Sequence, residues 1–181
     1  MKITEGPLTG LLIIEPRIFT DSRGYFYEVF QQQRYQEHGI PAFVQDNVSR
    51  SRYGVLRGLH YQLPHPQGKL VYVTRGSVWD VAVDIRVSSP TFGQWFGAHL
   101  NDENHKQIYI PPGFAHGFCV LSEEADFHYK CTDYYFPGTE QGIAWNDKRL
   151  NIPWLVHNPV LSPKDEILPG LNDITHAKLF P

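Results

Sequence analysis

A two-residue alternation between Trp79 and Arg86 constrains the fold of this chain more than any other sequence feature. Apolar residues stand at 79, 81, 83 and 85, whereas Asp80, Ala82, Asp84 and Arg86 occupy the positions between them. Alternate side chains of a β-strand lie on the same face, so the pattern predicts a strand with one buried and one wetter face. The preceding Arg75-Gly76-Ser77 predicts a hairpin turn back to a strand over residues 70–74.

Shorter segments of the same kind recur along the chain, each bounded by Gly, Pro, Asn or Asp. They are residues 12–14, 25–30, 91–100, 107–110, 116–120 and 126–135. Helical patterns are confined to residues 31–38 and a turn near 101–105, and the chain has 15 glycines and 14 prolines. Many short strands predict an all-β sandwich or barrel formed by residues 1–181 as one domain. From residue 151 onward, five prolines predict an irregular tail with short helical turns that wraps the body.

Composition excludes several classes of function. The net charge is −3 and no basic stretch is present, which argues against a nucleic-acid partner. No apolar run approaches the roughly 20 residues of a membrane span, and the N-terminus lacks a secretory pattern, so we expect a soluble, cytoplasmic protein without a membrane partner. Two cysteines, Cys119 and Cys131, are too few for a disulfide scaffold or a cysteine-based zinc site.

Three cationic or ionisable side chains crowd a segment that is otherwise apolar. Arg57 and His60 stand in VLRGLHYQ and Lys69 follows, so all three fall within one predicted strand pair. A lone histidine is more often a surface or structural residue than a functional one. Burying three such groups without partners is costly, however, and the cluster therefore predicts an anionic ligand.

His116 lies in IPPGFAHGF, a pattern that some β-barrel enzymes use for a metal-ligating histidine. Such a site needs about three protein ligands, and the complementary strand should then carry H-x-H followed by a glutamate. The chain has His60-Tyr61-Gln62 instead, with no carboxylate after it. The sequence therefore predicts no metal site, and His116 is interpreted as a hydrogen-bonding residue of a pocket.

The segment FHYKCTDYYFPG predicts a strand that carries Phe127, Tyr129, Cys131, Asp133 and Tyr135 on one face. Core packing accounts for Phe127. A tyrosine hydroxyl needs a partner when it is buried, so Tyr129 and Tyr135 suit a groove that holds a nucleotide-sugar, with one tyrosine at each end.

Ten segments, in order along nearly the whole chain, resemble the dTDP-4-dehydrorhamnose 3,5-epimerases of dTDP-L-rhamnose synthesis. They are PRIFTDSRGYFYE, FVQDNVSRS, VLRGLHYQ, QGKLV, GSVWDVAVDIR, SPTFGQW, IPPGFAHGF, YKCTDYY, GIAWND and LSPKD. The resemblance implies a metal-free, cofactor-independent cupin, which is an antiparallel jelly-roll barrel. It also implies a homodimer in which strands of one subunit extend the partner's sheet.

The same resemblance assigns roles to individual residues. It implies that His60 is the catalytic base, Tyr129 the proton donor, Asp165 the residue that orients the base, and Lys69 the cation beside the sugar carbonyl. Nucleotide and phosphate contacts are implied at Arg23, Glu28, Gln45, Asn47, Arg57, His116, Glu140 and Lys164, with Tyr135 stacked on the thymine. Judged without the resemblance, the segments around Arg23, Gln45 and Asp165 are structural by default.

The implied substrate, dTDP-4-dehydro-6-deoxy-D-glucose, is a C4 ketone with acidic hydrogens at C3 and C5. Epimerisation needs a base, a cation for the enolate oxygen and an acid on the opposite face, and no redox cofactor. A mono-epimerase that inverts C3 or C5 alone stays open as an alternative. A metal-dependent cupin is a further alternative, which bound metal in the purified protein would identify. A non-catalytic sugar-binding cupin is another, and solvent exchange at neither carbon would identify it.

Overall fold

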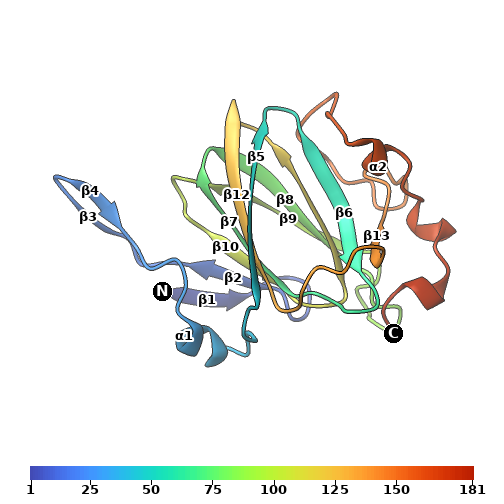
Figure 1. The fold of residues 1–181 in the computed structure, drawn as a ribbon, viewed down its shortest axis with the longest axis horizontal. Coiled ribbons are helices and arrows are strands. Elements are labelled where there is room, and N and C mark those ends of the chain that lie inside the picture. The colour runs from blue at the N-terminus through green and yellow to red at the C-terminus, as the bar shows by residue number, and fades with distance from the viewer.

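The computed structural model describes residues 1–181, which form two antiparallel β-sheets packed face to face (Figure 1). The strands are β1 (Lys2–Glu5), β2 (Leu12–Glu15), β3 (Phe19–Asp21), β4 (Gly24–Phe26), β5 (Gln45–Arg52), β6 (Leu56–Gln62), β7 (Lys69–Arg75), β8 (Ser77–Asp84), β9 (Trp95–Asn101), β10 (Gln107–Ile110), β11 (Phe114–Val120), β12 (Glu124–Cys131) and β13 (Glu140–Gly142). The helices are α1 (Gln32–Gln36), α2 (Pro163–Glu166) and two 3₁₀ turns, η1 (Leu171–Asp173) and η2 (His176–Lys178).

Strand order defines the two layers. The six-stranded sheet runs β1-β2-β10-β7-β12-β5 and the five-stranded sheet runs β13-β6-β11-β8-β9. Strands β3 and β4 form a separate hairpin that projects away from both sheets, at the left of Figure 1. This arrangement confirms the predicted cupin-type jelly roll with few, short helices.

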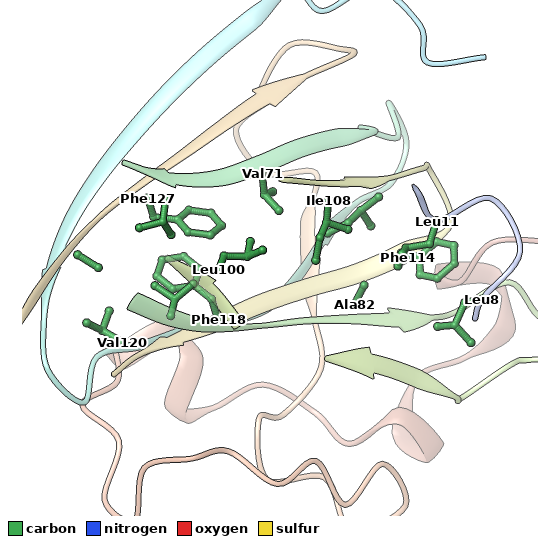
Figure 2. Close-up of a cluster of buried hydrophobic side chains, with 14 residues drawn as sticks. Leu8, Leu11, Val71, Ala82, Leu100, Ile108, Phe114, Phe118, Val120 and Phe127 are labelled. Atoms are coloured by element: carbon green, nitrogen blue, oxygen red, sulfur yellow. The ribbon is translucent and has the colours of Figure 1, made fainter. Parts of the chain in front are cut away.

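The main hydrophobic core lies between the two sheets (Figure 2). Phe118 of β11 and Phe127 of β12 come from opposite sheets and stack with ring centroids 4.0 Å apart. Fourteen buried side chains fill this layer, as inward-facing residues do in sandwiches generally.

Strand β8 is buried on both faces, which corrects the prediction of a wetter face. Ala82 belongs to the core between the sheets, whereas Val81 and Val83 pack outward against the C-terminal tail. Asp80 and Asp84 are therefore buried as well. Their polarity reflects internal hydrogen bonds rather than solvent, and the tail covers the sheet as predicted.

Residues 75–77 do not form the predicted hairpin turn. Strands β7 and β8 belong to different sheets, and Gly76 carries the chain from one layer to the other with φ +79°. A Cβ at this position would lie 2.0 Å from the carbonyl oxygen of Glu124, so the crossing requires glycine. Arg57 and His60 on β6 consequently face Lys69 on β7 from the opposite sheet, rather than within one strand pair as predicted.

Three predicted strands are too long, and the one predicted over residues 91–100 begins only at Trp95. The strand predicted over residues 25–30 ends at Phe26, and the one predicted over 126–135 ends at Cys131. Tyr135 thus lies on the loop after β12 and not on its face. No helix of the structure has the length and apolar character needed to cross a bilayer.

Candidate active site

A cavity of about 600 Å³ opens between the two sheets beside the hydrophobic core. All the predicted site residues except Arg23 and Glu28 line it. They are Gln45, Asn47, Arg57, His60, Lys69, His116, Tyr129, Tyr135, Glu140, Lys164 and Asp165. The structure therefore brings together residues from six strands, one loop and helix α2.

Strand register explains why residues distant in sequence meet here. In the six-stranded sheet, Cys131 stands between Lys69 on β7 and Gln45 on β5, and Tyr129 is opposite Asn47. In the facing sheet, His60 on β6 is opposite His116 on β11. Each row comes from alternate residues, so their side chains point to the same inner face.

His60 and Asp165 form a hydrogen-bonded pair on one wall. His60 Nε2 donates to Asp165 Oδ1 at 2.5 Å. Asp165 sits in the four-residue helix α2, where Ser162 Oγ accepts from its backbone N–H and Pro163 occupies the first helical position. Burial alone would raise the pKa of Asp165. Hydrogen bonds to its carboxylate outweigh burial, and the one from His60 contributes most, so the net pKa is lowered. An ionised Asp165 fixes the imidazole tautomer, because it accepts the N–H of Nε2.

A second carboxylate approaches the other ring nitrogen. Glu140 Oε1 lies 3.4 Å from His60 Nδ1, and its Oε2 pairs with Lys164 and accepts from the Tyr135 hydroxyl. Glu140 reaches this position because it is opposite Gln62 on β6, two residues along from His60. Burial raises the pKa of Glu140, and the Lys164 hydrogen bond and the His60 charge reverse this effect, so the net pKa is lowered.

Arg57 and Lys69 are the pocket cations without a carboxylate partner. Arg57 Nε and Nη2 share the hydroxyl of Ser51 at 3.2 and 3.1 Å, and Lys69 makes no hydrogen bond or ion pair. Burial lowers the pKa of Lys69, because removing water disfavours the ammonium ion. Two cations without a carboxylate partner make this part of the pocket chemically suited to an anion.

Tyr129 lies on the sheet opposite His60, and its hydroxyl has no hydrogen-bond partner within the protein. Burial raises the pKa of Tyr129, with smaller contributions from Cys131 and Glu140. The phenol therefore stays protonated across the physiological range and can donate a proton.

His116 has a partner that the sequence analysis missed. Its Nε2 donates to Asp80 Oδ2 at 2.7 Å, and the other carboxylate oxygen of Asp80 has no protein partner. The two-residue alternation predicts Asp80 on the wetter face of its strand. The available signal was an acidic residue inside an apolar run, where burial requires a partner.

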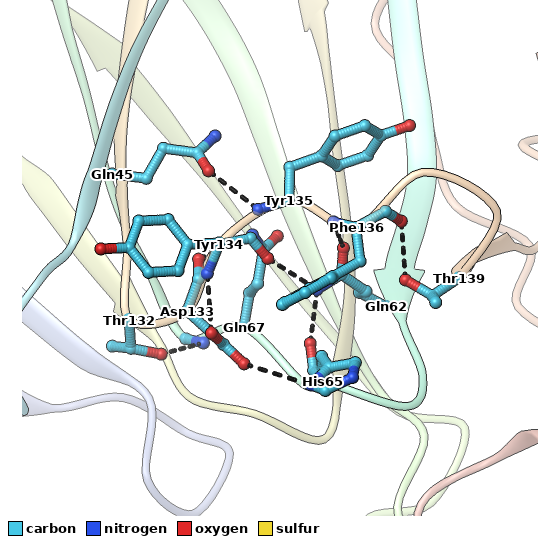
Figure 3. Close-up of polar contacts among 11 residues, drawn as sticks. Gln45, Gln62, His65, Gln67, Thr132, Asp133, Tyr134, Tyr135, Phe136 and Thr139 are labelled. Atoms are coloured by element: carbon cyan, nitrogen blue, oxygen red, sulfur yellow. Dashed lines mark hydrogen bonds and ion pairs between the residues drawn. The ribbon is translucent and has the colours of Figure 1, made fainter.

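Gln62 is a second missed residue, and it stands where a metal-binding cupin carries a histidine. Its side chain joins the loop after β6 to the loop after β12 (Figure 3). The amide Nε2 donates to the carbonyls of His65 and Tyr134, and Oε1 accepts from Phe136 N–H at 2.9 Å. Gln62 thus holds the loop that carries Tyr135, whose own N–H donates to Gln45.

Arg23 and Glu28 do not reach the pocket of their own chain. Arg23 lies in the turn of the exposed β3–β4 hairpin and forms an ion pair with Asp21. Glu28 forms an ion pair with Arg34 of α1. Figure 1 shows this hairpin pointing away from the barrel.

The arrangement combines a carboxylate-oriented base on one wall with a cation and a protonated phenol on the other. This set can remove a proton next to a carbonyl, stabilise the enolate and return a proton to the opposite face. Arg57 adds a forked donor for a phosphate.

Comparisons with known proteins agree with this geometry. The family model described as dTDP-4-dehydrorhamnose 3,5-epimerase matches residues 5–173. The dTDP-4-dehydrorhamnose 3,5-epimerase of Shigella flexneri is 55% identical over 168 residues, which span 91% of this chain and 93% of the relative.

Solved structures are similar to this chain as well. The dTDP-6-deoxy-D-glucose-3,5-epimerase of Legionella pneumophila, in complex with dTDP-4-keto-L-rhamnose, superposes with a TM-score of 0.96 at 56% identity and covers 99% of this chain and 97% of its own. A histidine-to-asparagine, tyrosine-to-phenylalanine double mutant of a 3′-monoepimerase from Streptomyces bikiniensis, in complex with dTDP, has a TM-score of 0.91 at 31% identity, with coverage of 98% and 91%.

Proposed function

The chain belongs to the dTDP-4-dehydrorhamnose 3,5-epimerase family, and from that premise we propose how its pocket performs the reaction. The substrate is dTDP-4-dehydro-6-deoxy-D-glucose, inverted at C3 and C5 to dTDP-4-dehydro-L-rhamnose. One observation carries the proposal. The His60–Asp165 pair faces Lys69 and the free hydroxyl of Tyr129 across a single cavity.

His60 removes the hydrogen next to the C4 ketone, and Asp165 stabilises the imidazolium that forms. The electron pair moves to the C4 oxygen, where the ammonium of Lys69 stabilises the enolate. Tyr129 then donates its proton to the opposite face of the same carbon, which inverts the centre. The sequence repeats at the second carbon, and the net reaction requires no oxidant or reductant.

Binding of the dTDP moiety is a separate task. Arg57 supplies two guanidinium donors for a phosphate, and the exposed ring of Tyr135 supplies a stacking surface for thymine. Gln45, Asn47, His116, Glu140 and Lys164 complete the proposed contacts in this chain.

Arg23 and Glu28 enter the proposal through a homodimer. Their hairpin projects from the barrel with exposed Phe19, Tyr25 and Phe26, an apolar surface that suits a protein contact. We assign Arg23 and Glu28 to the pocket of the partner subunit in a two-fold dimer. The cytoplasmic location stays a prediction from the sequence.

The test follows solvent deuterium into the keto-sugar nucleotide by NMR at C3 and C5. The wild-type protein should exchange and invert both carbons. His60→Asn should exchange neither, because the base is gone. Tyr129→Phe keeps the base and Lys69, so deuterium should enter mainly without inversion.

A packed aromatic ring with no chemical role would make Tyr129→Phe epimerise at the wild-type rate, and that result would remove Tyr129 from the mechanism. Exchange at one carbon only by the wild-type protein would favour the mono-epimerase alternative. The similarity to a 3′-monoepimerase at 31% identity is the observation that keeps this alternative in the design.

A further inference from the structure

Glu140 holds a position that the proposed chemical steps do not use. One of its oxygens, Oε1, lies 3.4 Å from His60 Nδ1. Its other oxygen, Oε2, accepts from the hydroxyl of Tyr135 and pairs with Lys164, whose side chain is half exposed. Glu140 therefore spans the distance between the base and the solvent side of the pocket.

His60 Nδ1 is the ring nitrogen available for proton abstraction, because Nε2 already donates to Asp165 at 2.5 Å. After abstraction the new N–H is on Nδ1. The carboxylate oxygen paired with Nδ1 is Glu140 Oε1, which lies 3.4 Å away.

Proton balance makes such an acceptor necessary. One inversion leaves an extra proton on His60 and removes one from Tyr129. A second inversion in the same pocket, or a new turnover, cannot begin until His60 has lost that proton and Tyr129 has regained one. With Asp165 already engaged at Nε2, a carboxylate at Nδ1 is the group that can accept it.

We propose that Glu140 receives the proton from His60 Nδ1 and passes it to water, which resets the base between the two inversions. The N–H bond on His60 breaks, an O–H bond forms on Glu140 Oε1, and that proton then leaves to solvent while Tyr129 takes a proton from solvent. No net charge or electron is transferred. Glu140 is ionised beforehand, since its pKa is lowered by Lys164 and His60 despite burial. The inference rests on the proposed epimerase function.

The experiment is a single-turnover reaction with enzyme in excess over dTDP-4-dehydro-6-deoxy-D-glucose, quenched at intervals. Glu140→Gln keeps the size and an acceptor oxygen but cannot take a proton to form a neutral acid. At enzyme concentrations that saturate binding, we expect the ratio of its second inversion rate to its first to fall by about tenfold or more relative to wild type. The sugar inverted at one carbon should then accumulate, and added imidazole should restore the second step.

Glu166→Gln is the matched control, because it removes one carboxylate from the same short helix as Asp165 without touching His60. It should behave as wild type. Equal slowing of both inversions in Glu140→Gln without an imidazole response would show that Glu140 only arranges its neighbours. A raised KM alone would show that it only contacts substrate. Either result overturns the relay, whereas a wild-type protein that inverts neither carbon overturns the proposed function itself.

Discussion

Lys69 shows how a single side chain sets the pH range of a pocket. Its ammonium must be charged to stabilise an enolate, and Tyr129 must be protonated to act as an acid. Burial lowers the pKa of Lys69 and raises the pKa of Tyr129. Both shifts favour loss of the lysine proton before the tyrosine proton as pH rises.

This order predicts which group controls the alkaline limb of kcat/KM, a quantity that reports the free enzyme. Lys69 is charged, and therefore active, only at pH values below its pKa. Because burial lowers that pKa, kcat/KM should begin to fall at a lower pH than the ordinary pKa of lysine would give. Lys69→Arg, which stays charged at every accessible pH, should lower kcat/KM and remove that limb. Lys106→Arg on the surface should leave the limb in place. A limb that persists unchanged in Lys69→Arg would assign it to another group.

At the same scale, the chemical groups of the pocket could be predicted from the sequence, and their partners only partly. His60, Lys69 and Tyr129 follow from residue type and resemblance. Asp80 was missed because a two-residue alternation does not tell whether the polar face of a strand meets water or a second layer. The tail that covers β8 lies about 90 residues later in the chain, so nothing local to β8 indicates double burial.

At the scale of elements, the end of β12 decides where the proposed thymine-binding ring lies. The sequence predicted one strand through Tyr135, because apolar and aromatic residues continue past Cys131. Instead, Gln62 draws residues 134–136 toward β6 with two hydrogen bonds, and the chain leaves the sheet. Such a side-chain bond between loops has no periodic signature, so the sequence could not locate this boundary.

Gln62→Leu should therefore weaken substrate binding without changing the chemistry. Three part-buried hydrogen bonds to the backbone are lost, each worth about 1 kcal/mol, and the loop of Tyr135 loosens (Figure 3). We expect KM to rise by about tenfold with kcat within twofold of wild type, since His60 and Tyr129 do not contact Gln62. Gln33→Leu, an exposed change on helix α1, is the control. A fall in kcat at unchanged KM would mean that Gln62 acts on the catalytic groups instead.

At the scale of the whole molecule, the barrel accounts for every predicted site residue except two. Arg23 and Glu28 sit on or beside a hairpin that meets no part of its own pocket (Figure 1). The sequence places them next to the site only through resemblance, because intrachain patterns carry no information about a neighbouring subunit. The exposed aromatic residues of the hairpin and the long edge strand β5 are the features that suit a second copy.

A mixed dimer tests this assignment directly. Neither Arg23→Ala nor His60→Asn should show appreciable kcat/KM alone, since the first lacks a phosphate contact and the second lacks the base. The two variants are co-expressed with different tags and purified through both tags, so that every dimer contains one chain of each variant.

If Arg23 serves the partner's pocket, the Arg23→Ala chain keeps its own His60 and receives an intact Arg23 from its partner. One pocket per dimer is then complete, and kcat/KM should recover to about half of the wild-type value. If Arg23 served its own pocket, no pocket would hold both residues and the mixed dimer would stay as inactive as its parents. A stable 20.8 kDa monomer in sedimentation at micromolar concentration would refute the dimer before any kinetics were needed.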